Sequence, residues 1–282
     1  MPVFWYESFG RDHSEKARTM GDSVRHPVEW PPKHQSIALA FEHAAFPVSL
    51  GFVAGFVDIF GFMALLGLLP AHVTGNLIFL AIDIARHQPN LIMKIAAIPI
   101  FAVSVAISAW LIGTLRASGR HPFLPMILLQ AAVLGLSVVA GLFLPMPVTP
   151  DDTTAVVVGS MMLFAMALQN TIMRLILNNL PPTTIMTGNI TNMISEGVRW
   201  LAGFGPAMTG VETRTLTYRA RRTGFALVSF IVGAIAGGLA QVHIGYVGLL
   251  APIAALLILL PIGRAELRAA FLQLAQQERL HK

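Results

Sequence analysis

The sequence "TGNLIFLAIDIAR", residues 74–86, recurs as "TGNITNMISEGVR", residues 187–199. The two copies share Thr-Gly-Asn at the start and an arginine at the end. Each also carries an acidic residue, Asp83 or Glu196, at the same position. Two copies of one motif, each preceded and followed by long apolar segments, indicate an internal repeat, which is a common architecture among membrane transporters.

The composition is typical of an integral membrane protein. Of 282 residues, 55% are hydrophobic and only 12% are charged, whereas soluble domains carry about 25% charged residues. Most of the apolar runs approach the roughly 20 residues that a helix needs to cross a bilayer, and unpaired backbone groups are too costly in lipid for other structures. We therefore predict an all-α, polytopic helical membrane protein with apolar helices in 46–69, 91–115, 122–145, 154–177, 223–241 and 244–263.

The repeat divides the membrane part into two tandem four-helix units, 41–150 and 151–263. A proline precedes each Thr-Gly-Asn copy and suits the first position of the second helix in its unit. We expect helices over roughly 46–69, 71–87, 91–116 and 122–145, and then over 154–178, 182–201, 220–241 and 244–263.

The number of crossings lies between six and eight. A helix from Pro70 to His87 would be about 27 Å long at 1.5 Å per residue, close to a core of about 30 Å, which favours eight crossings and parallel repeats. In a six-crossing chain this segment is half of a re-entrant hairpin, and the repeats are inverted. The positive-inside bias does not distinguish the two, and both place the termini and the loop 199–222 in the cytoplasm.

The two ends of the chain are polar. Residues 1–40 have no apolar core of a signal peptide, and we interpret them as a disordered, basic cytoplasmic tail. Residues 264–282 form a second basic cytoplasmic tail with helical periodicity. The net charge of +5 comes from segments that flank the membrane, so we expect a lipid bilayer and no nucleic acid as the partner.

Asp58 lies near the middle of the first apolar helix. A carboxylate there costs several kcal/mol unless it is protonated, paired or hydrated. One hypothesis is a site that couples to a proton or cation or binds a substrate amine; the alternative is a structural hydrogen bond. Aligning the two units places Asn170, beside Gln169, at the position that corresponds to Asp58.

The Thr-Gly-Asn motifs combine small and polar groups near a helix N-terminus, where free N–H groups favour anions. Either they contact a substrate or ion, or they hold helices together through small and polar side chains. The residues concerned are Thr74, Gly75, Asn76, Thr187, Gly188 and Asn189.

An acid and an arginine lie three residues apart in each copy and share a helix face with the asparagine of the motif. This polar stripe suggests a gate or the lining of an aqueous path, and the alternative is an intrahelical ion pair at the membrane surface with a snorkelling arginine. The pairs are Asp83 with Arg86 and Glu196 with Arg199.

Two GxxxG patterns, Gly51 with Gly55 and Gly233 with Gly237, predict close helix packing within the chain or in a homo-oligomer. No nucleophile–base arrangement, phosphate-binding loop, dinucleotide fingerprint or metal-ligand spacing is evident. We therefore expect no enzyme activity, no cofactor and no metal.

The stretch "AGFVDIFGFMALLGLLPAHVTGN", residues 54–76, resembles the YoaK-type family of bacterial inner-membrane proteins, as do "QNTIMR" and "PPTTIMTGN" in the second half. The resemblance covers about 46–263. It implies a multi-pass protein of the bacterial cytoplasmic membrane, but no activity, because the family carries a domain-of-unknown-function label. Its signature positions would include Asp58, Gln169, Asn170 and both Thr-Gly-Asn motifs.

The leading functional hypothesis is a transporter or channel for a small molecule or ion, with Asp58 as the coupling group. The alternative is a non-transporting membrane scaffold or sensor in which Asp58 and the Thr-Gly-Asn motifs are structural.

Overall fold

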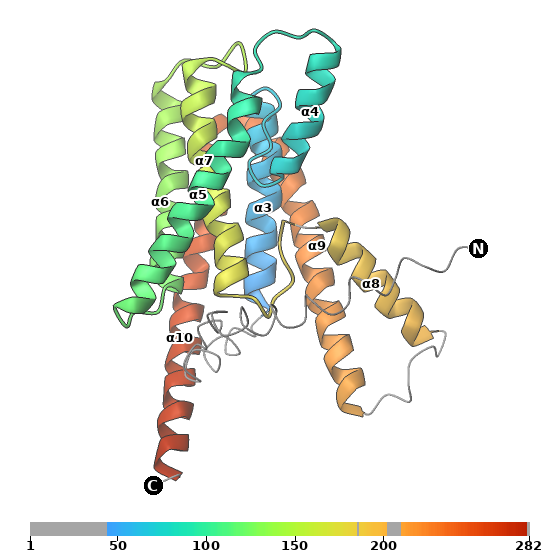
Figure 1. The fold of residues 1–282 in the computed structure, drawn as a ribbon, viewed down its shortest axis with the longest axis vertical. Helices are drawn as coiled ribbons and strands as arrows, with labels where there is room; N and C mark the ends of the chain where they lie inside the picture. Colours follow the sequence, from blue (N-terminus) through green and yellow to red (C-terminus); the bar gives the residue numbers. More distant parts are fainter. Residues whose placement is uncertain (1–43, 185, 202–209, 281–282) are drawn as a thin grey trace, which may run out of the picture. The chain divides into compact units, whose positions relative to one another are not determined.

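The computed structural model describes residues 44–184, 186–201 and 210–280, and every regular element within them is helical. The prediction of an all-α chain is confirmed, while the predicted tail 1–40 lies outside the described residues. The elements in chain order (Figure 1) are α3 (Ala45–Ala64), α4 (Val73–Ala85), α5 (Ile92–Ala117), α6 (Phe123–Phe143), α7 (Thr153–Leu175), α8 (Met186–Leu201), α9 (Gly210–Ile244), the 3-10 helix η2 (Gly245–Leu249) and α10 (Leu250–Leu280).

Five helical segments of the described chain are long and apolar enough to cross a bilayer, so this is a membrane-type helical protein. The last of them contains both α9 and α10, which are joined at η2 and run back on either side of α3 (Figure 1). The segments are Ala45–Ala64, Ile92–Ala117, Phe123–Phe143, Thr153–Leu175 and Ala220–Ala269.

The two helices that carry the Thr-Gly-Asn motifs are short. α4 has 13 residues and α8 has 16, which corresponds to about 20 and 24 Å against a hydrocarbon core of about 30 Å. The predicted 18-residue helix from Pro70 to His87 is therefore wrong, because α4 begins at Val73 and ends at Ala85.

The chain leaves the helical conformation between α3 and α4 for a local reason. Leu66 and Gly67 have φ values of 55° and 104°, and the Gly67 N–H donates to the Phe62 carbonyl, which caps the end of α3. The segment from Leu68 to His72 then continues without helical structure, and a similar non-helical segment separates α7 from α8.

α3 makes its most extensive contact with α9, and the two helices run parallel. Their GxxxG patterns lie in this contact: Gly51 and Gly55 face the α9 backbone, and Gly233 and Gly237 face the α3 backbone. A Cβ atom at Gly55 would overlap the carbonyl oxygen of Phe230, so only glycine permits this approach.

α5 and α7 form the corresponding parallel pair in the rest of the bundle. Asp151 accepts hydrogen bonds from the Ile92 and Met93 N–H groups at one end, and Arg116 donates to the Leu175 carbonyl at the other. α3 and α7 run antiparallel, because Gln169 near the end of α7 bonds to Leu50 near the start of α3.

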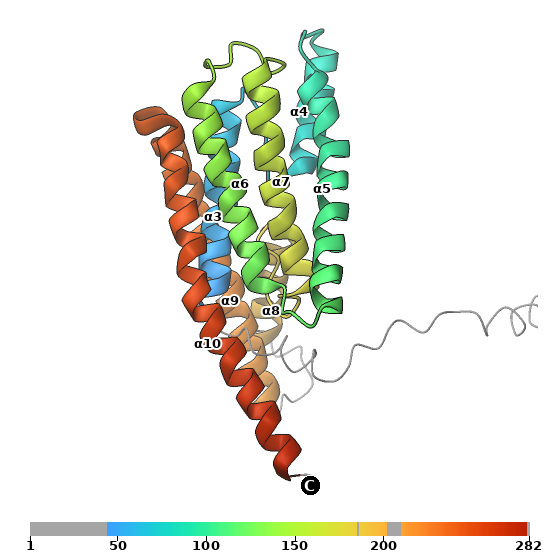
Figure 2. The same ribbon diagram turned by 90° about the vertical axis from the view of Figure 1, so that its left-hand side faces the viewer.

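The other helices pack on these four. α6 packs on α7, α10 packs on α3, and α4 and α8 pack on α5 and α9 respectively (Figures 1 and 2). α9 begins at Gly210, so the predicted loop 199–222 is helical over its last part, and α10 carries the basic segment 264–280 as a continuation of the last helix.

Candidate functional site

Asp58 holds the segment that leads into α4. Its side chain is buried, and its Oδ1 atom accepts hydrogen bonds from the backbone N–H groups of Ala71 (2.8 Å) and His72 (3.2 Å). Backbone donors next to a helix N-terminus have no partner within the helix. The carboxyl group of α3 supplies that partner and fixes the start of α4 against the middle of α3.

His72 completes a pair with this carboxyl group. Its Nδ1 atom lies 2.6 Å from Asp58 Oδ2, so a hydrogen bond joins the imidazole ring to the carboxyl group. The Asp58 side chain is only 4% exposed, whereas that of His72 is 28% exposed and packs edge-on against Phe230 of α9. The histidine therefore connects a buried acid to the surface of the bundle.

The break between α7 and α8 contains the corresponding arrangement without ionisable groups. Asn170 Oδ1 accepts a hydrogen bond from the Thr184 hydroxyl, and Asn170 Nδ2 donates to the Met166 carbonyl at 3.1 Å. Asn170 and Thr184 are 14 residues apart, the same separation as Asp58 and His72. The first break thus contains an acid and a histidine at the sequence separation at which the second contains an amide and a hydroxyl.

The asparagines of the Thr-Gly-Asn motifs bond to the non-helical segments that precede them. Asn76 is fully buried; its Nδ2 donates to the Leu69 carbonyl at 2.9 Å, and its Oδ1 accepts from the Leu69 N–H at 2.8 Å. Asn189 Nδ2 donates to the carbonyl of Pro182 at 2.6 Å, but a proline has no N–H to return.

The other motif residues are more open. Thr74 and Thr187 are exposed, and Gly75 and Gly188 are half-buried. A Cβ at Gly75 would lie 2.6 Å from the Leu69 side chain, so the glycine lets the non-helical segment pass close to α4.

Gln169 lies in a fully buried polar network. Its Nε2 donates to the Leu50 carbonyl at 2.8 Å and to the Thr183 hydroxyl at 3.0 Å, and its Oε1 accepts from Gln130 of α6 at 2.8 Å. The network joins α3, α6, α7 and the non-helical segment after α7. Neither Gln130 nor Thr183 was predicted from the sequence, although a glutamine inside an apolar helix is a usable signal of a buried polar contact.

The charged end of α4 has a partner that sequence analysis also missed. Asp83 forms an ion pair with Lys94 of α5, which is 8% exposed, while Arg86, the residue expected from helical spacing, is the exposed C-cap of α4. Glu196 is half-buried, and the side chain of Arg199 lies outside the described residues. Asp83 therefore contacts α5 at the end of α4, whereas the Asp58–His72 pair lies at the start of α4, more than two helical turns away.

Within the described residues no three His, Asp or Glu side chains are grouped closely enough to hold a metal ion. At the first break, the ionisable side chains in contact are those of Asp58 and His72.

A comparison with known protein families matches the part of the chain that contains both helix breaks. A family model described as "Protein of unknown function (DUF1275)" matches residues 46–262, which is well over half of the 282 residues. The chain belongs to the DUF1275 family. No curated protein and no solved structure matches it. The expected assignment to a family of unknown function is confirmed, and the DUF1275 label itself carries no activity.

Proposed function

We propose that this DUF1275 protein is a transporter or channel for a small molecule or ion in the bacterial cytoplasmic membrane, with Asp58 as the coupling group. The observation that carries the proposal is the difference between the two helix breaks. Asp58 and His72 occupy the place that Asn170 and Thr184 occupy in the other half.

The neutral pair shows that a bond between the first helix and the following segment does not need charge. A buried carboxylate in a membrane costs several kcal/mol, so an acid that only fastened the chain would be an expensive substitute for an asparagine. The partly exposed His72 would give the buried acid a route for exchanging a proton with the surroundings, which an asparagine could not use.

The arrangement of the helices supports a transport role. Each half contains a long helix, a non-helical break and a short helix, and short interrupted helices at corresponding positions of two halves point to the binding site in transporters of known architecture. Because α3 and α7 run antiparallel and each packs on the third helix of the other half, we propose inverted repeats with six crossings rather than eight.

The distribution of arginines supports the proposed orientation. Arg116 bonds to the end of α7, so the C-terminal ends of α5 and α7 lie at the same end of the bundle. Arg120 follows α5 and Arg174 lies in the last turn of α7 at this end, and Arg264 lies within α10. By the positive-inside rule, we propose that this end of the bundle faces the cytoplasm, which agrees with the cytoplasmic termini expected from the sequence. We also propose, from the sequence resemblance, that the chain is a YoaK-type member of its family.

The test is proton movement in liposomes. Purified protein is reconstituted with a pH-sensitive dye inside the vesicles, and amino acids, carboxylates, sugars and inorganic cations are offered from outside. We expect Asp58→Asn to reduce solute-dependent proton flux at least tenfold, because asparagine still accepts the Ala71 and His72 N–H groups but cannot ionise.

Asn170→Ala is the matched control, because it removes the bond at the other break without removing an ionisable group. It should lower thermal stability and leave the flux of each folded molecule unchanged. Wild-type flux in Asp58→Asn would remove Asp58 from the mechanism. A wild type that moves no protons with any solute, and variants that differ only in stability, would support the scaffold or sensor alternative.

A further inference from the structure

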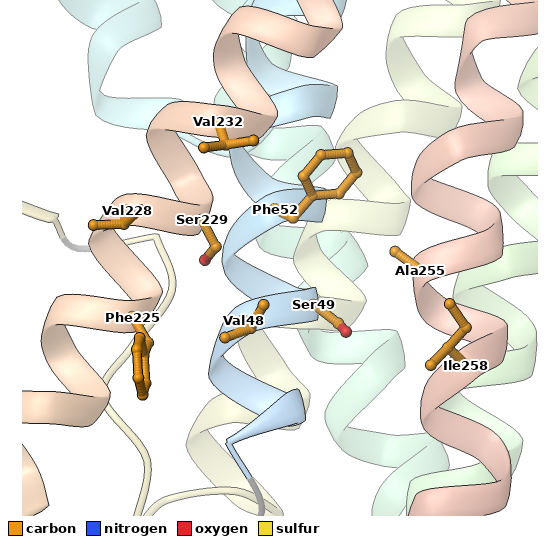
Figure 3. Close-up of a pocket in the computed structure, with 9 residues that line it drawn as sticks. All are labelled: Val48, Ser49, Phe52, Phe225, Val228, Ser229, Val232, Ala255 and Ile258. Atoms are coloured by element: carbon orange, nitrogen blue, oxygen red, sulfur yellow. The ribbon is translucent and has the colours of Figure 1, made fainter.

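A separate feature of the bundle is an open apolar groove between α9 and α10. Its volume is about 440 Å³, within the range of roughly 300–1,000 Å³ usual for small-molecule sites. α9 and α10 form its walls and α3 its floor (Figure 3). The lining residues are Val48, Ser49, Phe52, Phe225, Val228, Ser229, Val232, Ala255 and Ile258.

The lining is suited to a hydrocarbon chain. Val228, Val232 and Ile258 are each more than half exposed along the walls. The helices are held apart at this depth because α3 lies between them and packs on both. A chain lying along α3 would cover these side chains from two sides, which a lipid on a convex helix surface cannot do.

The hydroxyl of the lining residue Ser229 donates to the Ala226 carbonyl within α9, and the other polar groups lie toward one end of the groove. The Ser49 hydroxyl points from the floor toward α10 (Figure 3), near the start of α3. The guanidinium of Arg221 is exposed and lies 5.3 Å from the ring centroid of Phe225, the lining residue nearest to the start of α9. Arg264 and Arg268 of α10 are exposed beyond Ile258 at the same end.

We propose that this groove binds one anionic phospholipid of the cytoplasmic leaflet. The acyl chain lies along Phe52 and Val232, the ester region reaches Ser49, and the phosphate pairs with Arg221. An arginine suits a phosphate because its planar fork donates two hydrogen bonds at once. The site is independent of Asp58 and does not require that the protein transports anything.

The experiment is native mass spectrometry of the full-length protein in detergent, titrated with phosphatidylglycerol or with phosphatidylcholine of the same acyl chains. We expect one phosphatidylglycerol to bind several times more tightly than phosphatidylcholine. Arg221→Gln should weaken phosphatidylglycerol binding about fivefold, which corresponds to about 1 kcal/mol for one arginine near an anionic surface, and should leave phosphatidylcholine binding unchanged.

Two further variants make the result specific. Ala255→Phe fills the groove from α10 and should abolish the tight site for either lipid, while Arg120→Gln removes an exposed arginine at the same end of the bundle but away from the groove and should change nothing. Equal binding of both lipids, or equal effects of Arg221→Gln and Arg120→Gln, would show that the groove makes only non-specific contacts with lipid and would overturn the proposal. A dimer that Ala255→Phe dissociates would show that a second copy occupies the groove and would overturn the proposal.

Discussion

The contact between α3 and α9 makes a quantitative prediction for Gly55→Ala. A Cβ atom at position 55 would lie 2.9 Å from the carbonyl carbon of Phe230 and 3.0 Å from the backbone nitrogen of Ala234, and closer still to the Phe230 oxygen. Backbone atoms in a helix cannot swing aside as a flexible side chain can. The two helices must therefore separate by roughly 1 Å at this point.

The cost follows from that displacement. A gap of about 0.5–1 Å removes a quarter to a half of the dispersion energy of each affected contact, and overpacking of a well-packed interior costs typically about 1–3 kcal/mol. We expect Gly55→Ala to lower the free energy of unfolding by about 2 kcal/mol. At about 2–4 °C per kcal/mol, Tm falls by about 4–8 °C.

The assay is thermal unfolding in detergent, followed by tryptophan fluorescence. Gly113→Ala in α5 is the matched control, because a Cβ there meets no atom within 4 Å, and we expect its Tm to be unchanged or slightly higher. If Gly55→Ala has the same Tm as the wild type, or if Gly55→Ala and Gly113→Ala lower Tm by the same amount, the glycine contact between α3 and α9 is not as close as described.

The other predictions concern the break, the ion pair and the topology. Asn76→Ala should lower Tm more than Asn189→Ala, because Asn76 exchanges two hydrogen bonds with Leu69 and Asn189 donates one to Pro182; equal losses would contradict this. Asp83→Ala should cost about 1–3 kcal/mol by leaving Lys94 unpaired, and Lys94→Met in that background should restore part of the stability; no recovery would argue against the pair. In the cysteine-free chain, Gln88→Cys should react with a membrane-impermeant maleimide from outside and Ser118→Cys only after lysis; the reverse pattern would indicate eight crossings.

The long helices could be predicted from the sequence because each of them is a long apolar run. α5 and α6 lie within two residues of their expected ends. The start of α4 could not be predicted from the sequence, because a proline that suits the first turn of a helix also suits an extended segment. The choice between them depends on Asp58, 13 residues earlier than Ala71 in the chain.

The candidate site was predictable only in part. Asp58, Asn170 and the asparagines of the repeated motif could be named because polar groups in apolar helices are conspicuous. Their partners could not be named, since His72, Thr184 and Lys94 meet them only after the chain folds back. Helical spacing paired Asp83 with Arg86, although the partner lies on α5.

The most direct test of the account transplants the neutral pair into the first break. The double variant Asp58→Asn/His72→Thr gives α3 and the segment before α4 the two residue types that join α7 to the segment before α8. We expect a Tm within about 2 °C of the wild type, because the neutral hydrogen bond of the transplanted pair takes the place of the bond between Asp58 and His72. We also expect loss of solute-dependent proton flux in liposomes. A double variant that still moves protons would contradict it, and so would one that fails to fold, because the charged pair would then be needed for the architecture itself.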